Sequence, residues 1–237
     1  MDTVEISIVV PVYNEAEGVE RLHRTVAETM RGRESRYELI LVDDGSTDGS
    51  AEKLDRIAAG DERVRVLHFE RNCGQTSAIS AGLKEARGRY VALIDADLQT
   101  DPADIFTLLP YMDRYDFANG TRARRRDSLV KRVSSRIANG FRNWITRDSI
   151  ADTGCPMKLF KREVALSFHL YEGFHRFLPT LARMNGFSVV EVPVSHRRRE
   201  QGESKYGVFN RLFVSLMDAF VIGWLRRRVI HYKIRGH

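Results

Sequence analysis

The sequence predicts an α/β protein in which a mostly parallel sheet is covered by helices on both faces. Short β-branched runs alternate with helical stretches over the first 120 residues, an order typical of a doubly wound sheet. Two of the runs, Ser7–Val12 and Leu39–Val42, are almost continuously apolar, as expected of strands that are buried on both sides. The chain has 237 residues, of which 43% are hydrophobic, so it is long enough to bury one sizeable core.

Five strands and four helices account for this first half. The strands are expected at Ile6–Pro11, Tyr37–Val42, Val64–Phe69, Tyr90–Ile94 and Phe117–Asn119. The helices between them are expected at Glu15–Arg31, Asp48–Ala59, Gln75–Ala86 and Pro102–Leu109. Each helix follows one strand and leads to the next, which is why a parallel arrangement is expected.

The two halves of the chain carry opposite net charge. Residues 1–118 contain 14 Lys and Arg against 23 Asp and Glu, a net charge of −9, whereas residues 119–237 contain 24 against 9, a net charge of +15. A strongly basic surface commonly meets phosphates, either in nucleic acid or in anionic membranes. The two cysteines, Cys73 and Cys155, form neither a disulfide framework nor a zinc pattern, and the first residues show no export signal, so we expect a cytoplasmic protein.

Several carboxylates follow the predicted strands. Asp43 and Asp44 come directly after the second strand, and Asp95 and Asp97 come after the fourth. Because ligands of open parallel sheets lie beyond the carboxyl ends of the strands, these side chains are expected to meet at one rim. Asp95 and Asp97 are two residues apart in an extended segment, so they project to the same side. Such a pair suits Mg²⁺ or Mn²⁺ bridging a substrate diphosphate; the alternative is that Asp97 or Asp101 only caps the next helix.

Two common phosphate-binding patterns are absent from the sequence. No GxGxxG follows the first strand and no GxxxxGKS occurs anywhere, which argues against dinucleotide cofactors and P-loop hydrolysis. Asp43 and Asp44 are instead placed to accept hydrogen bonds from a nucleobase or a ribose. The segment Ser46–Ser50 also has an ordinary interpretation as a turn that leads into a helix cap.

Four motifs in this half occur in the order found in family 2 glycosyltransferases, which the chain resembles. They are Val9-Val10-Pro11-Val12-Tyr13-Asn14-Glu15, Asp43-Asp44-Gly45-Ser46, Asn72-x-Gly74-Gln75 and Asp95-Ala96-Asp97-Leu98-Gln99. Further motifs resemble the dolichyl-phosphate mannosyltransferase-like branch, which includes bacterial enzymes acting on undecaprenyl phosphate. These are Gly120-Thr121-Arg122, Asp152-Thr153-Gly154-Cys155, His175-Arg176-Phe177 and Arg199-x-x-Gly202-x-Ser204-Lys205.

The resemblance implies a GT-A fold, a nucleoside-diphosphate sugar donor such as a GDP- or UDP-sugar, and a divalent metal, Mg²⁺ or Mn²⁺. It implies a GT-A domain over residues 1–207, with a nucleotide-sugar half at 1–120 and an acceptor half at 121–207. The donor would be held by Pro11, Tyr13, Glu15, Asp43, Asp44, Gln75, Asp95 and Lys205. The metal would be held by Asp95, Asp97 and Gln99, and the residues closest to the chemistry would be Asp97, Arg122 and Asp152.

A lipid phosphate is the expected acceptor. A phosphate monoester has a second pKa near ~6, so it is a competent nucleophile at neutral pH and needs no general base. It needs cations that hold it in line with the sugar, and Arg122, Arg136 and Arg199 are expected to supply them. Asp152 would act as a base only for a hydroxyl acceptor; otherwise it would orient an arginine or the sugar. His175 is open to two interpretations, as a site residue or as a packing residue.

The C-terminal segment, residues 208–237, is expected to be an amphipathic, basic tail at the membrane interface. Arg211, Ser215 and Asp218 form a narrow polar stripe on an otherwise apolar helix. The run from Leu212 to Leu225 covers only about 21 Å, against a hydrocarbon core of about 30 Å, so the helix is not expected to span the bilayer. With Trp224 and the following arginines, it suits peripheral attachment to the inner face of the membrane. The alternative is a helix packed on the catalytic domain or on a partner.

Two other functions remain open. A family 2 glycosyltransferase acting on a saccharide or protein hydroxyl would share the donor motifs but would need a general base. A nucleic-acid-binding module would explain the sequence pI of about 9.5, but no helix-turn-helix, zinc-finger or RNP pattern occurs and the acidic half would repel a phosphate backbone, so no nucleic-acid partner is expected. The sequence leaves the sugar, the nucleobase, the polyprenyl acceptor and the oligomeric state open.

Overall fold

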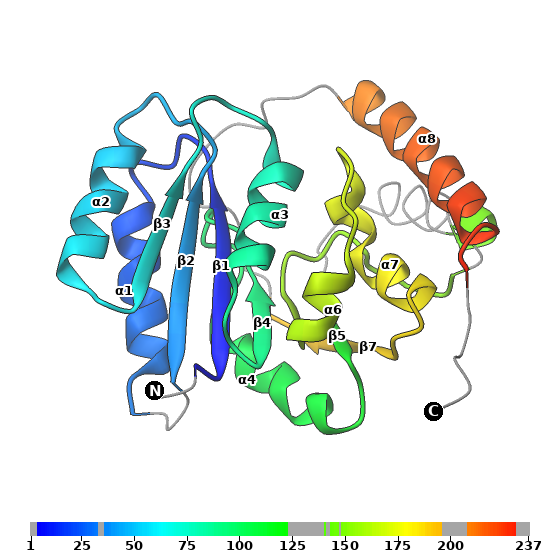
Figure 1. Cartoon of the computed structure of the whole chain (residues 1–237), viewed down its shortest axis with the longest axis horizontal. Coiled ribbons are helices and arrows are strands. Elements are labelled where there is room, and N and C mark those ends of the chain that lie inside the picture. The colour runs from blue at the N-terminus through cyan, green and yellow to red at the C-terminus, as the bar shows by residue number, and fades with distance from the viewer. Residues whose placement is uncertain are drawn as a thin grey trace, which may run out of the picture.

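A computed structural model describes residues 4–32, 36–122, 140, 143–146, 148–195 and 208–230. One seven-stranded sheet organises the chain, in the order β3-β2-β1-β4-β6-β5-β7 (Figure 1). The strands are β1 (Ile6–Val12), β2 (Tyr37–Asp43), β3 (Val64–His68), β4 (Tyr90–Leu93), β5 (Phe117–Arg122), β6 (Lys158–Lys161) and β7 (Val189–Val194). All neighbouring strands pair in parallel except β6, which is antiparallel to β4 and to β5. The predicted mostly parallel sheet is therefore confirmed.

Helices cover both faces of this sheet. They are α1 (Val19–Met30), α2 (Ser50–Gly60), α3 (Gln75–Glu85), α4 (Asp104–Leu108), α6 (Arg162–Ser167), α7 (Leu178–Met184) and α8 (Val208–Arg226), with 3₁₀ turns η1 (Leu109–Asp113) and η2 (Phe174–Phe177). Buried residues of α1, α2 and α4 pack in one apolar cluster. Those of α3, α6, α7, η2 and α8 pack in a second cluster. The same sheet separates the two clusters, since alternate strand residues point to opposite faces.

The predicted elements of the first half are confirmed with small shifts at their ends. The largest shift is at α1, which begins at Val19 instead of Glu15. Glu15 instead accepts turn bonds from the main-chain N–H groups of Gly18 and Val19, so the residues after β1 form a loop at the rim of the sheet. The predicted helix Pro102–Leu109 becomes a short α4 that continues as the 3₁₀ turn η1.

The second half completes the sheet with two strands that the sequence pattern does not reveal. β6 has only four residues and lies between β4 and β5, and β7 pairs in parallel with β5 over six residues. Both strands are short and mixed in composition, with Lys at each end of β6 and a Pro in β7. β6 lacks the β-branched signal on which strand prediction depends, whereas β7 contains four Val but also a Pro, which counts against a strand.

Helix α8 packs on the α3 and α7 side of the sheet. Ala219 and Ile222 are fully buried there, and Gly223 lies against the main chain of Ile145. Asp218 faces the domain, where its carboxylate lies 3.6 Å from the guanidinium of Arg176. Within the described residues, no helix combines the length and apolar composition needed to cross a bilayer. The proposed boundary at residue 207 stays a prediction, because residues 196–207 lie outside the described ranges.

Replacing Phe160 by Ala is expected to lower the free energy of unfolding by about 3–5 kcal/mol. Phe160 is fully buried and stacks on Phe117, with 4.9 Å between ring centroids, so the truncation would leave a cavity between β5 and β6. Urea unfolding followed by circular dichroism would measure the change. The control Leu166→Ala, at a side chain that is 50% exposed, should lose less than about 1 kcal/mol. A loss for Phe160→Ala as small as the control's would contradict this account of the core.

Candidate functional site

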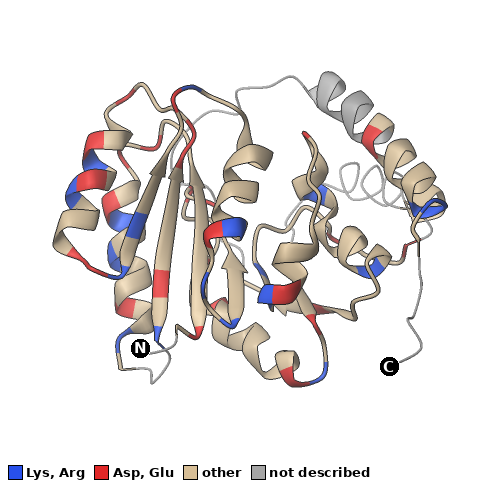
Figure 2. Cartoon of the chain, in the orientation of Figure 1, with Lys and Arg blue, Asp and Glu red and all other residues tan. Residues whose placement is uncertain are grey.

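The candidate site lies at the carboxyl edge of the parallel strands, on the loops that follow β1, β2 and β4. Figure 2 shows acidic residues on the loops beyond β1 and β2, and basic residues at the C-terminal end of α8. The sheet order places β1 between β2 and β4, so the three loops are neighbours. The sequence motifs predicted at this rim are therefore brought together by the fold.

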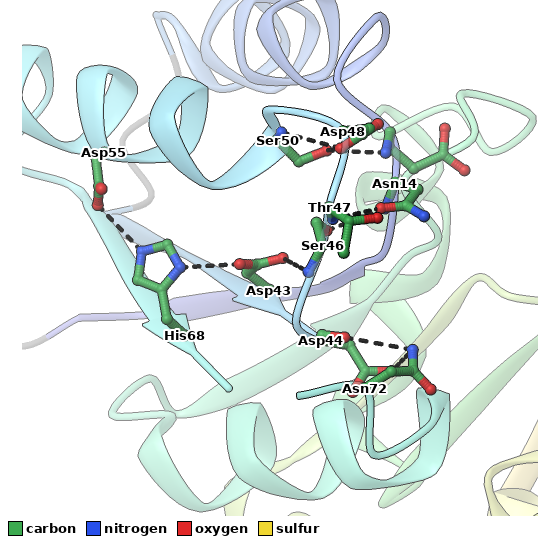
Figure 3. Close-up of polar contacts among 11 residues, drawn as sticks. Asn14, Asp43, Asp44, Ser46, Thr47, Asp48, Ser50, Asp55, His68 and Asn72 are labelled. Atoms are coloured by element: carbon green, nitrogen blue, oxygen red, sulfur yellow. Dashed lines mark hydrogen bonds and ion pairs between the residues drawn. The ribbon is translucent and has the colours of Figure 1, made fainter. Parts of the chain in front are cut away.

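The loops after β1 and β2 are tied together by side-chain bonds to the main chain (Figure 3). The Asn14 N–H donates to Ser46 Oγ at 3.0 Å, and the Thr47 N–H donates to Asn14 Oδ1 at 2.8 Å. The Ala16 N–H donates to Asp48 Oδ2 at 3.0 Å. Asn14 has a positive φ of 54°, a left-handed conformation that Asn tolerates better than most residues. The two motifs thus form one interlocked loop structure.

Asp43 is buried and holds the end of β2. Its Oδ1 accepts the Ser46 N–H at 3.0 Å, and its Oδ2 lies 3.0 Å from His68 Nδ1. The other ring nitrogen of His68 lies 3.1 Å from Asp55 Oδ1, so the imidazole bridges two carboxylates (Figure 3). Burial lowers the pKa of His68, but the hydrogen bonds to Asp43 and Asp55 outweigh it, and the net shift is upward. The role of Asp43 towards the nucleoside stays a prediction.

Asp44 is also buried, and its carboxylate accepts three hydrogen bonds from the loop before α3. The donors are the Asn72 side chain at 3.0 Å, the Cys73 N–H at 2.7 Å and the Gly74 N–H at 3.0 Å. Burial raises the pKa of Asp44, and the two N–H bonds partly offset this rise. Gly45, with a φ of +68°, lies so close to the next loop that an added Cβ would stand 2.4 Å from the carbonyl carbon of Arg71. Asp44 therefore fixes the third loop of the rim to the second.

Three other predicted nucleoside residues, Pro11, Tyr13 and Glu15, lie at the end of β1 or directly after it. Pro11 is buried within β1, whereas Tyr13 is 41% exposed directly after that strand. Glu15 is half-buried, and its N–H donates to Ser50 Oγ at 3.0 Å. An exposed aromatic ring beside backbone and carboxylate acceptors suits a base and a ribose.

The predicted metal residues follow β4. Asp95 Oδ1 accepts a 3.1 Å hydrogen bond from the amide of Gln75, the first residue of α3, and Asp97 Oδ1 accepts the Gln99 N–H at 3.1 Å. Burial raises the pKa of Asp95 to about 6, and the negative charge of Asp97 adds to this shift. Leu98, between Asp97 and Gln99, has a φ of 59°, a strained conformation for a residue of this kind and one that is common at functional sites.

The chemistry of this pair fits a divalent cation. Asp101, and not Asp97, accepts the Ala103 N–H at the start of the next helical turn, so Asp97 is not needed as its cap. Among the described residues, no group of three or more His, Cys, Asp or Glu side chains is placed to enclose an ion. Two carboxylates completed by substrate phosphates are, however, the usual way in which Mg²⁺ is held. Asp95 and Asp97 fit this kind of site, and Gln99 lies next to them.

Arg122, the last residue of β5, forms a bidentate ion pair with Asp152. The pair lies on the side of β4 that faces away from β1. Arg122 Nε and Nη2 lie 2.7 Å from Asp152 Oδ2 and Oδ1. The loop that carries Asp152 is anchored by Glu191 of β7, which accepts the Ala151 and Asp152 N–H groups at 3.0–3.2 Å. Asp152 therefore holds the guanidinium of Arg122, and its role in the reaction stays a prediction.

His175 lies close to the site through its contact with α3. Its Nδ1 lies 2.6 Å from Thr76 Oγ1, and Thr76 also accepts the Gly173 N–H at 3.0 Å. Burial, with the positive charges of Arg176 and Lys158, lowers the pKa of His175 to about 3, so the imidazole is neutral at physiological pH. This histidine is thus fixed beside the first turn of α3, next to Gln75.

Three predicted site residues, Arg136, Arg199 and Lys205, lie outside the described residues, and their roles stay predictions. Sequence reasoning missed three others: Asn119, Lys158 and Glu191. Lys158 is the residue that follows Asp152-Thr153-Gly154-Cys155 by three positions, at the start of β6. Only the strand pairing, which sets Lys158 opposite Leu93 of β4, brings it near Asp95.

Comparison with known proteins shows the family of this chain. Residues 7–167 match the model of a family described as "Glycosyl transferase family 2". This chain belongs to glycosyltransferase family 2. The glycosyltransferase is 35% identical over 244 aligned residues to dodecaprenyl-phosphate galacturonate synthase of Rhizobium johnstonii, covering 100% of this chain and 71% of that one. It is 39% identical to undecaprenyl-phosphate 4-deoxy-4-formamido-L-arabinose transferase of Edwardsiella ictaluri, covering 86% of this chain but 63% of the relative.

Solved structures confirm the GT-A fold of the glycosyltransferase. Glucosyl-3-phosphoglycerate synthase from Mycobacterium tuberculosis, in complex with Mn²⁺, UDP and glucosyl-3-phosphoglycerate, superposes with a TM-score of 0.68 at 17% identity, over 96% of this chain and 81% of that one. A mannosyltransferase from Pyrobaculum calidifontis, in complex with GDP-Man and Mn²⁺, gives a TM-score of 0.66 at 18% identity, covering 98% of this chain and 66% of that one. The resemblance to the polyprenyl-phosphate branch is confirmed by the names of the two relatives above.

Replacing His68 by Gln is expected to remove a pH-dependent contribution to stability. Because the folded-state pKa of His68 is raised, its contribution is fully present below the unfolded-state pKa of about 6.5 and is lost as pH rises through the folded-state value. The stability difference between wild type and variant, measured by urea unfolding, should thus be larger at pH 5.5 than at pH 8.5. Its size should stay below about 1 kcal/mol, since the ring is partly exposed. His169→Gln, at an exposed histidine, is the control. If His68→Gln changed stability equally at both pH values, the contacts of His68 with Asp43 and Asp55 would not have the expected effect.

Proposed function

We propose that this glycosyltransferase moves a sugar from a nucleoside-diphosphate sugar to a polyprenyl phosphate, with a divalent cation bound at Asp95 and Asp97. The observation that carries the proposal is the division of charge at the rim. Two carboxylates lie on one side of the strand ends, and an arginine clamped by Asp152 lies on the other. Burial raises the pKa of Asp95, and the positive charges of Lys158 and Arg122 act against this rise, so the charges of the two sides interact.

The arginine side suits an anionic acceptor. Asp152 holds the guanidinium of Arg122 at two points, which fixes its direction before any ligand arrives. The same two contacts occupy the only carboxylate predicted as a general base, so an acceptor that needs no base fits better. A phosphate dianion is such an acceptor, because it is already a nucleophile at neutral pH. The names of the relatives, a dodecaprenyl-phosphate and an undecaprenyl-phosphate transferase, support the same acceptor class.

The carboxylate side suits the donor. Tyr13 offers an exposed ring for a nucleoside directly after β1, and Asp43 and Asp44 follow the neighbouring strand β2. Gln75 donates a hydrogen bond to Asp95. A bound Mg²⁺ or Mn²⁺ would neutralise the leaving diphosphate. Structural neighbours that contain Mn²⁺ with UDP or with GDP-Man support this donor class. The chain's own residues would then position the sugar and the acceptor in line with each other.

The outer face of α8 supports attachment to a lipid surface. Its exposed apolar side chains are Met217, Phe220, Val221 and Trp224, at the three- and four-residue spacing of one helix face. The three arginines that follow, residues 226–228, are exposed. Arg228 stacks on Trp224 with 4.9 Å between guanidinium and ring centroid. Ile145 lies against Gly223 of α8, and its neighbour Trp144 is 74% exposed.

This surface combines what an interfacial helix requires. Aromatic rings prefer the headgroup region, and basic residues attract anionic lipid at about 1 kcal/mol each. We therefore propose that the enzyme binds peripherally to the cytoplasmic face of the membrane with this side of α8. The polyprenyl phosphate would then reach Arg122 from the bilayer.

The transfer reaction can be tested directly. Purified protein with Mn²⁺, undecaprenyl phosphate in detergent and a panel of UDP- and GDP-sugars should yield an organic-extractable sugar lipid with at least one donor. Adding EDTA, or changing Asp97 to Asn, should lower kcat by about 100-fold or more, because the leaving diphosphate loses its neutralising charge.

Asp113→Asn, at an exposed carboxylate far along η1, is the matched control and should leave the rate unchanged. Transfer only to a saccharide or protein hydroxyl would overturn the lipid acceptor. Full activity in EDTA would overturn the metal site.

The membrane proposal predicts that Phe220→Glu weakens binding to vesicles about tenfold or more. The change puts a charge where about 1.5–3 kcal/mol of apolar burial is expected. Co-sedimentation with vesicles containing anionic phospholipid would measure it, and raising the salt concentration should weaken wild-type binding as well. Leu166→Glu, at an exposed apolar residue away from α8, should bind like wild type. Equal binding of both variants would rule out this face.

A further inference from the structure

Lys158 and Asn119 are two buried polar residues directly opposite each other on neighbouring strands. The register of β5 and β6 pairs them, and the next pair along the strands on the same face is the stacked Phe117 and Phe160. Lys158 is 3% exposed and Asn119 is fully buried. Directly opposed residues in an antiparallel pair have their Cβ atoms about 4.5–5.5 Å apart. The two polar groups therefore lie side by side, next to the stacked rings of Phe117 and Phe160.

Both groups have hydrogen-bonding capacity that the described protein does not use. The Asn119 amide donates to the Asp152 carbonyl at 2.8 Å, which fixes the direction of the side chain and leaves its Oδ1 buried without a partner. An ammonium has three donors, and Lys158 Nζ donates to one described acceptor, the carbonyl of Cys155. Buried groups of this kind are nearly always satisfied in proteins. A ligand with hydroxyl groups could satisfy both.

Lys158 and Asn119 lie between the two halves of the site, because β6 and β5 follow β4 in the sheet. Lys158 pairs with Leu93, two residues before Asp95. Burial lowers the pKa of its ammonium, while the negative charges of Asp95 and Asp152 act in the opposite direction. Asn119 is bonded to the main chain of Asp152, the residue that orients Arg122. The transferred sugar must lie between the donor's diphosphate and the acceptor, and Lys158 and Asn119 lie in this interval.

A purely structural role would not require a charge here. An isolated buried ammonium costs several kcal/mol unless it is compensated, and an apolar side chain would fill the space above Phe117 and Phe160 without that cost. Residues that lower stability in this way are typical of binding and catalytic sites.

We propose that Lys158 and Asn119 form the floor of the sugar subsite, where the ammonium donates to a hydroxyl oxygen of the transferred sugar and Asn119 Oδ1 accepts a hydroxyl proton. This inference rests on the proposed function and adds the residues that select the sugar. A hydroxyl group is both donor and acceptor, so it matches the two groups together. Loss of such a contact to a charged donor should reduce kcat/KM by about 10- to 100-fold.

The experiment compares wild type with Lys158→Met, using the best nucleotide sugar of the transfer screen and its free nucleoside diphosphate. The variant should lose about 10- to 100-fold in kcat/KM, whereas the Kd of the nucleoside diphosphate, measured by calorimetry with Mn²⁺, should change less than twofold. Its Tm should equal or exceed that of wild type, because the desolvation cost of a buried ammonium has been removed. A fall in Tm with unchanged kcat/KM per folded molecule would assign Lys158 to the framework and overturn the proposal.

Lys161→Met is the matched control on the same strand. Lys161 makes a 2.7 Å ion pair with Asp116 at the other end of β6, and its loss should leave kcat/KM unchanged. If Lys158→Met does not fold, Lys158→Gln keeps a polar donor at the position and should show a smaller loss of kcat/KM; equal activity to wild type would also overturn the proposal. Should wild type transfer sugar only to a hydroxyl acceptor, the proposed function fails, while the effect of Lys158 on donor use is still measured with that acceptor.

Discussion

The antiparallel pairing of β6 with β4 is the constraint on which the rest of the site depends. β4 delivers Asp95 and Asp97 at its carboxyl end, and β6 starts at the same edge with Lys158. Because β6 runs in the opposite direction, the loop that precedes it, with Asp152, arrives at the same rim. β5 then pairs with the other side of β6 and brings Arg122 to Asp152. A single four-residue strand thus joins a carboxylate half of the site to a cationic half.

The electrostatics of the rim follow from this juxtaposition. Burial and mutual repulsion raise the pKa of Asp95 to about 6 in the protein alone, so the carboxylate pair is a place where added positive charge is stabilising. The cations of the other half are restrained: Arg122 by Asp152, and Lys158 by burial beside Asn119. Fixed charges that need no rearrangement when charge develops in a reaction are the main source of electrostatic stabilisation in enzymes.

The interlocked loops and α8 show how framework and function share residues. Most hydrogen bonds of Asp43, Asp44 and Asn14 connect the three loops to one another. A nucleoside would therefore meet a preformed surface. On α8 the polar Asp218 points inward to Arg176, while Phe220 and Trp224 point outward. Ala219 and Ile222 are also buried against the domain, so α8 is apolar on both sides, and the described residues do not cover its outer apolar face.

The sequence by itself determined the parallel half of the sheet and the motifs at its rim, because buried parallel strands are continuous apolar runs and the loops that follow them carry the polar residues. It also singled out Arg122 and Asp152. It could not show that these two form a pair, that His175 contacts Thr76, or that Asp43 is turned towards His68, since each contact joins residues from different elements. Asn119 lies in a strand that the sequence predicted, but no local motif marked Asn119, Lys158 or Glu191 as a site residue. Only the register of β4, β6, β5 and β7 decided where their side chains meet, because strand pairing depends on contacts between residues far apart in the chain.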